Sequence, residues 1–129
     1  MASKKDTKLV IKVDASSQFA KELIKYLQKG KVKFEVIPAT DIPEADKIKF
    51  LSARITSRIL TERIANILIG VDFEYIFQIA AVKEEWFRKI RNFGEISVDD
   101  LRVSFAENGL EFGNVPHDLL DKAEALARS

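Results

Sequence analysis

The stretch LVIKVDASSQFAKELIKY, residues 9–26, predicts a strand, a polar turn and an amphipathic helix in immediate succession. Residues 9–13 are nearly all apolar and rich in β-branched side chains, which is typical of a strand covered on both faces. Ser16 or Ser17 can cap the helix. The apolar residues of the helix recur at helical spacing, and Gly30 ends it. They are Phe19, Leu23, Tyr26 and Leu27.

A second strand and a second helix are expected directly after this unit. Val32, Phe34 and Val36 alternate with charged residues, so this strand has one polar face. A strand, a helix and a strand within about 30 residues form a right-handed βαβ unit with parallel strands. Pro43 and two acidic residues then favour a short helix that runs to about Leu51.

Residues 54–71 admit two interpretations. The alternation in RITSRIL (54–60) and the apolar run IANILIGV (64–71) favour two antiparallel strands, because β-branched residues are dense in both. One long helix over residues 44–69 is the alternative, since the connection at 61–63 has no Gly or Asn for a tight turn. We adopt the hairpin as the expectation.

The remaining elements are expected as a long helix, a second hairpin and a last helix. Asp72 caps a helix over 73–91 that Gly94 stops, and Asn108-Gly109 makes the turn of a hairpin over 101–112. Residues 114–116 start the last helix. We therefore divide the chain into a flexible leader (1–7), a core (8–92) and an extension packed on the core (93–129).

Composition limits the function. The 129 residues suit a single domain, and 21 basic against 20 acidic residues give a net charge of +1, which demands no anionic partner. The absence of cysteine excludes disulfides, thiolate metal sites and thiol–disulfide redox catalysis. No metal or cofactor is expected. The absence of a secretory signal or a long apolar run predicts a cytoplasmic protein that does not enter membranes, and the charge density suits a heat-adapted host.

The expected order β-α-β-α-β-β-α over residues 8–92 resembles the glutaredoxin branch of the thioredoxin-like fold. Ser17-Gln18-Phe19-Ala20 stands where that family has Cys-Pro-Tyr-Cys, and Ser52-Ala53-Arg54 stands where it has Thr-Val-Pro with a cis-proline. Residues 69–73, IGVDF, resemble its Ile-Gly-Gly-Phe. The segments 46–48 and 63–70 also resemble the cysteine-free KaiB family. The resemblance implies an α/β, thioredoxin-like sandwich whose thiols and cis-proline are lost.

Three functions are compatible with these residues. The first is a non-catalytic protein-interaction or assembly module, with a protein partner or a second copy of the chain bound at Arg58, Trp86 and Phe87. The second is a glutathione- or anion-binding protein that uses Ser17 and Gln18 at a helix start together with Arg54. The third is a nucleic-acid-binding protein that uses Arg54, Arg58 and Arg63.

Overall fold

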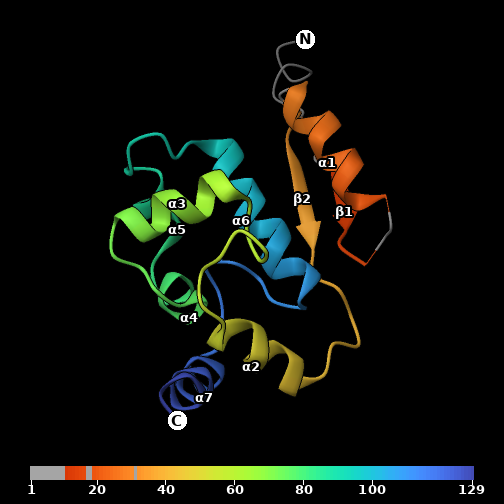
Figure 1. The fold of residues 1–129 in the computed structure, drawn as a ribbon. Helices are drawn as coiled ribbons and strands as arrows, with labels where there is room; N and C mark the ends of the chain where they lie inside the picture. The colour runs from red at the N-terminus through yellow and green to blue at the C-terminus, as the bar shows by residue number, and fades with distance from the viewer. Residues whose placement is uncertain (1–10, 17–18, 31) are drawn as a thin grey trace.

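The computed structural model describes residues 11–16, 19–30 and 32–129, and it is mixed α/β (Figure 1). The elements follow in the order β1 (Ile11–Asp14), α1 (Ala20–Lys29), β2 (Phe34–Ile37), α2 (Glu44–Ser52), α3 (Glu62–Gly70), α4 (Ile76–Ala80), α5 (Glu84–Phe87), α6 (Glu95–Glu107) and α7 (His117–Arg128). The predicted leader, residues 1–7, lies outside the described residues.

The predicted βαβ unit is confirmed. Strands β1 and β2 pair in parallel with Val13 opposite Val36, and α1 ends at Gly30 as expected. Ile24 and Leu27 of α1 pack with Val13 in one small cluster. Two expectations fail here, because β1 is exposed at Ile11 and Lys12 rather than covered on both faces. Of the predicted stripe of α1, Leu27 is buried as expected, but Phe19, Leu23 and Tyr26 are exposed, and Ala20 and Ile24 form the rest of the buried side.

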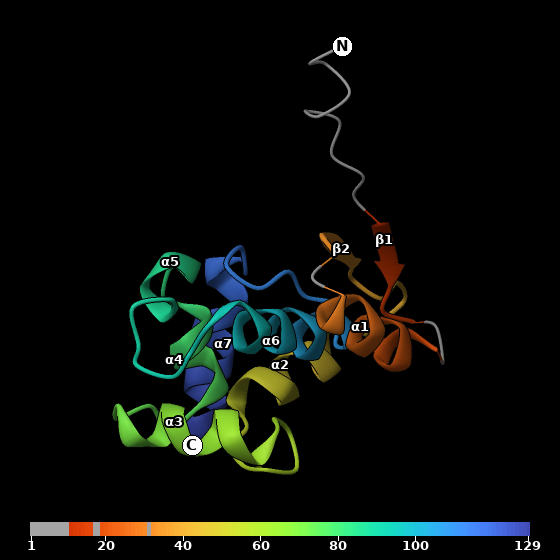
Figure 2. The same ribbon diagram turned by 90° about the horizontal axis from the view of Figure 1, so that it is seen from above.

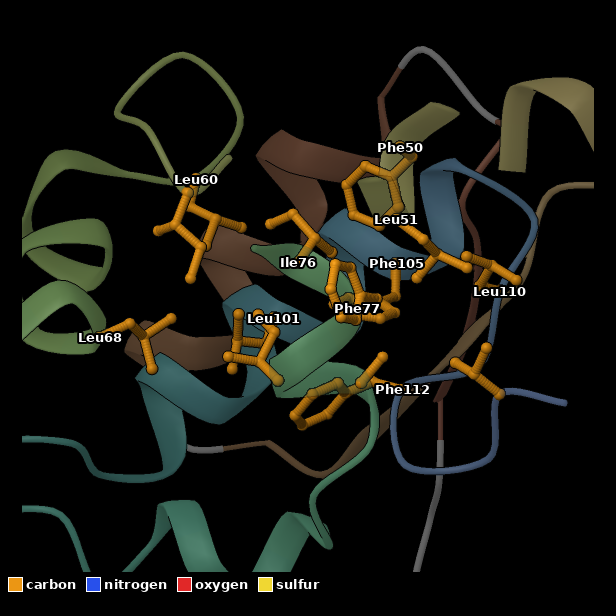
Figure 3. Packing of buried hydrophobic residues seen from close by; sticks show 14 of the residues in the cluster. Phe50, Leu51, Leu60, Leu68, Ile76, Phe77, Leu101, Phe105, Leu110 and Phe112 are labelled. Atoms are coloured by element: carbon orange, nitrogen blue, oxygen red, sulfur yellow. The ribbon is translucent and has the colours of Figure 1, made fainter. Parts of the chain in front are cut away.

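A larger hydrophobic core lies among the helices. Helix α2 is present as predicted and packs against α7, the predicted last helix. Phe105 lies at the centre of this core, edge-on to Phe50 at 5.2 Å and to Phe112 at 5.0 Å between ring centroids (Figure 3). These aromatic contacts join α2, α6 and the segment that leads to α7, so they fix the helical part of the molecule.

Helix α6 replaces the predicted hairpin over 101–112. Its side chains are buried on two sides: Leu101 and Phe105 enter the large core, and Val103 enters the small cluster with α1 and β1. The alternation of Leu101, Val103 and Phe105 suggested a strand, but it arises because this helix packs against an apolar cluster on each of two sides. The Asn108-Gly109 turn does form, but it ends the helix: Gly109 has φ 74°, and the Leu110 amide donates to the Phe105 carbonyl.

The predicted hairpin over 54–71 is also wrong, and so is the alternative long helix. Residues 53–61 interrupt the helices, and residues 62–70 form α3. The Thr61 hydroxyl accepts a hydrogen bond from the Ile64 amide at 3.4 Å and caps α3. The helix was missed because its β-branched residues favour strands. In place of the predicted third strand, Arg54 forms an isolated antiparallel β-bridge with Tyr75.

The long helix predicted over 73–91 is divided into α4 and α5. Asp72 has φ 72°, and the Gln78 side chain accepts hydrogen bonds from the amides of Glu74 and Tyr75, so the helix begins at Ile76. Gly94 precedes α6 instead of ending a helix. Within the described residues the sheet has two strands, so the predicted order β-α-β-α is present from β1 to α2 but the third and fourth predicted strands are not.

Replacing Phe105 with alanine should test the central position of this residue. The side chain is fully buried, so Phe105→Ala should lower the free energy of unfolding by about 3–5 kcal/mol in urea denaturation. The control is Leu126→Ala in α7, whose side chain is 51% exposed and whose loss should change stability by less than about 1 kcal/mol. Equal effects of the two substitutions would show that Phe105 is not in the core.

Candidate functional site

Arg63 connects the starts of α3 and α6. It lies in the first turn of α3, two residues after the N-cap Thr61. Its guanidinium donates from one terminal nitrogen to the Asn92 carbonyl oxygen at 3.1 Å and from the other to the Ser97 hydroxyl at 2.6 Å. Ser97 is 1% exposed and lies in the first turn of α6. The two helix starts are therefore fixed to one another by a cation whose hydrogen-bond partners are both neutral.

The backbone between α5 and α6 brings polar groups to the same place. Asn92 has φ 68°, and the buried side chain of Phe93 holds this loop against the core. Gly94 precedes α6 and no side chain caps the helix. The amides of the first turn, which have no intrahelical partner in any helix, therefore also lack a side-chain cap here, and they make this end of the helix partly positive.

The loop that contributes the Asn92 carbonyl also carries two basic residues. Lys89 and Arg91 lie on the loop before α6 and are exposed. Among residues 11–16, 19–30 and 32–129, neither of them nor Arg63 makes an ion pair. Arg88 differs, because Glu95 and Glu84 both pair with it and its pKa is raised by the bond with Glu95. The surface around Arg63 thus carries positive charge that no neighbouring carboxylate neutralises by direct contact.

Two carboxylates of α6, those of Asp99 and Asp100, are partly buried. Burial raises the pKa of Asp99 and of Asp100. Asp100 accepts a hydrogen bond from the Gln28 side chain of α1 at 3.3 Å. That bond, and the charges of Arg63 and Lys25, offset the effect of burial in part. Asp100 therefore lies where α1, α3 and α6 come together.

A groove of about 570 Å³ extends from this point between α1 and α6. Its floor is apolar and includes Ile24, Leu60 and Val103, and its rim carries Lys21, Lys25 and Arg58. Figure 2 shows α1 beside α6, with the helical body on the other side of α6. The groove lies between the βαβ unit and the helical body.

Of the three residues that were predicted to form one ligand site, the structure describes Arg54. Ser17 and Gln18 lie outside the described residues. Arg54 is at the end of α2, where it pairs with Glu74 at 3.2 Å and lies over the Tyr75 ring at 5.5 Å from its centroid. Intramolecular partners thus occupy the guanidinium that was expected to bind an anion.

The predicted interaction surface is corrected at one position. Trp86 is 42% exposed, but Phe87 is fully buried and stacks on Phe73 with a centroid separation of 5.9 Å, so it cannot contact a partner. Arg58 is exposed on the groove. The sequence indicated Arg63 as a candidate nucleic-acid contact but did not indicate Asn92 or Ser97. These residues are about 30 positions from Arg63, and no sequence motif predicts that they lie beside it.

The described part of the chain lacks two further features, a cluster of metal ligands and a helix that could span a membrane. There, no three His, Asp or Glu side chains come together as metal ligands would. No helix that the structure describes has the length and apolar character needed to cross a membrane.

Comparison with known proteins gives one partial similarity. The chain is 33% identical over 69 residues to the DNA-directed RNA polymerase subunit alpha of Campylobacter fetus subsp. fetus (strain 82-40). The match covers 54% of this chain and 20% of the relative, so the chain spans about a fifth of that subunit. No family model matches the chain. No solved structure matches it either.

The pKa of Asp100 gives a stability prediction with a defined sign. Because its pKa in the folded protein lies above the ordinary value of 3.8, the folded state holds this proton more tightly than the unfolded state does. The resulting stabilisation is complete below that value and is lost as the pH rises through the pKa of the folded protein. Asp100→Asn should therefore gain stability relative to the wild type between about pH 3 and about pH 7, measured by urea denaturation.

Asp14→Asn provides a control of opposite sign. Hydrogen bonds from the hydroxyl and the amide of Ser16 lower the pKa of Asp14, so its stabilising contribution is present above 3.8 and is lost in acid. The variant should lose stability relative to the wild type over the same pH rise. A change of the same sign in both variants would contradict the assignment for Asp100.

Proposed function

We propose that this chain is a non-catalytic module that binds double-stranded DNA through the surface around Arg63. The observation that carries the proposal is the position of Arg63, whose charge is held by a carbonyl and a hydroxyl rather than by a carboxylate. A guanidinium has five N–H donors, so donors remain after these two bonds. Such a group is suited to hydrogen-bond a phosphate oxygen.

The surroundings of Arg63 support a phosphate contact. The uncapped amides at the start of α6 are adjacent, and anions bind favourably at helix N-termini. Lys89 and Arg91 add positive charge from the preceding loop. Contacts of this kind position a duplex and provide affinity that depends on salt but not on base sequence.

The comparison supports DNA as the partner. The relative is, by its name, a subunit of a DNA-directed enzyme, and the similarity is to about a fifth of it. A similarity to so small a part of the subunit fits a binding module better than a complete enzyme. A further protein partner or a second copy of this chain, bound near Trp86, stays a prediction, and so do the cytoplasmic location and the thioredoxin-like relationship of β1 to α2.

The glutathione- or anion-binding alternative has less support, because Arg54 already pairs with Glu74. The same pair argues against Arg54 as a nucleic-acid contact. Of the three arginines first considered for nucleic acid, Arg63 has the most favourable surroundings.

The proposal can be tested by fluorescence anisotropy with a labelled DNA duplex of mixed sequence over a range of salt concentrations. Arg63→Ala should weaken binding roughly tenfold or more, since a hydrogen bond to a charged group contributes about 1.5–3 kcal/mol. It should also reduce the slope of log K against log[salt] by about 1. Arg54→Ala removes the same charge at an ion-paired site and should leave binding within about twofold of the wild type.

A second variant separates binding from folding, because Arg63 also holds the loop and α6 together. Lys89→Ala/Arg91→Ala removes two charges that make no described ion pair, and it should weaken binding with the thermal unfolding temperature unchanged. Absence of binding by the wild-type chain, or equal affinity of the Arg63 and Arg54 variants, would refute the proposal.

A further inference from the structure

We propose that the exposed lysines of α1 together with Arg58 extend the DNA-binding surface, so that the βαβ unit and the helical body contact the same phosphate backbone. This inference rests on the proposed function, and it assigns a role to the part of the chain before α2. It concerns residues Lys21, Lys25 and Lys29, which are all exposed.

The three lysines form a row along α1. Residues four apart lie on one side of a helix, and eight residues span about 12 Å at 1.5 Å per residue. Phosphates on one DNA strand follow at about 3.4 Å along the duplex axis, so the row has the length of about three to four phosphates. A row of this length can contact a backbone at several points.

The row runs along α6 toward Arg63. Gln28 near the end of α1 bonds to Asp100 near the middle of α6, at 3.3 Å, and Lys21 near the start of α1 pairs with Glu107 at the end of α6, at 3.6 Å. The two helices are therefore antiparallel, and the later lysines lie toward the junction of α3 and α6. The charges of both Lys25 and Arg63 act on Asp100, which places the lysine row and the arginine around one carboxylate.

Arg58 lies on the other side of the groove. It belongs to the segment between α2 and α3, five residues before Arg63, and it is exposed. Arg58, Lys25 and Lys29 make no ion pair within the described ranges, so their charges are available to a ligand. The acidic groups facing the groove are Asp100 and Glu107, and each already has a described partner, Gln28 and Lys21 respectively.

The test compares two double variants that remove the same charge. Lys25→Gln/Lys29→Gln changes the row and leaves the ion-paired Lys21 in place. Lys122→Gln/Arg128→Gln changes α7, which lies at the far end of the helical body in Figure 1. Binding of the mixed-sequence duplex is measured by anisotropy as a function of salt, with the wild type and Arg63→Ala in the same series.

The lysine variant should bind the duplex at least fivefold more weakly than the α7 variant and should reduce the salt slope by about 2, because about 0.9 is lost for each phosphate contact. If Arg63→Ala weakens binding but the two double variants behave alike, the lysine row is not part of the interface and the proposed function is unaffected. If the wild type does not bind the duplex, the proposed function fails and this inference fails with it.

Discussion

The packing of α6 against two hydrophobic clusters at once is the constraint on which the rest of the structure depends. Phe105 and Leu101 enter the large helical core, and Val103 enters the cluster formed by β1 and α1. The βαβ unit runs only from Ile11 to Ile37, and segments shorter than about 40 residues rarely fold alone. The βαβ unit therefore depends on α6 for the apolar surface that completes its burial, and the relative placement of the two parts follows from one helix.

The same constraint determines what the start of α6 can present. With the middle of the helix buried, its first turn is held next to α3, where Ser97 and the Asn92 carbonyl receive the two donors of Arg63. The cation is thereby oriented without being neutralised. A fixed guanidinium and the uncapped amides of α6 lie together, the loop before α6 is basic, and the lysines of α1 lie along the same helix.

The βαβ unit, α2 and α7 were predicted and are present. Helices α1 and α7 each have an apolar side, and α2 was indicated by Pro43 and the acidic residues that follow it. The errors fall where the local pattern of apolar residues imitates a strand. The alternation at Leu101, Val103 and Phe105 imitates a strand because α6 is buried on two sides, and the β-branched run in α3 imitates one because tertiary packing outweighs its local propensity. The site was predicted only in part. Arg63 was recognisable as a basic residue, but its hydrogen bonds to Asn92 and Ser97 join segments about 30 residues apart, which the sequence does not reveal.

The central claim, that nucleic acid binds where α3 and α6 begin, is tested most directly by two-dimensional ¹H–¹⁵N NMR during titration with a DNA duplex. The account predicts that the largest changes in amide chemical shift occur over residues 61–66 and 89–97, with smaller changes along α1. Changes concentrated around Trp86 and Ile69, or no changes at saturating duplex, would contradict it.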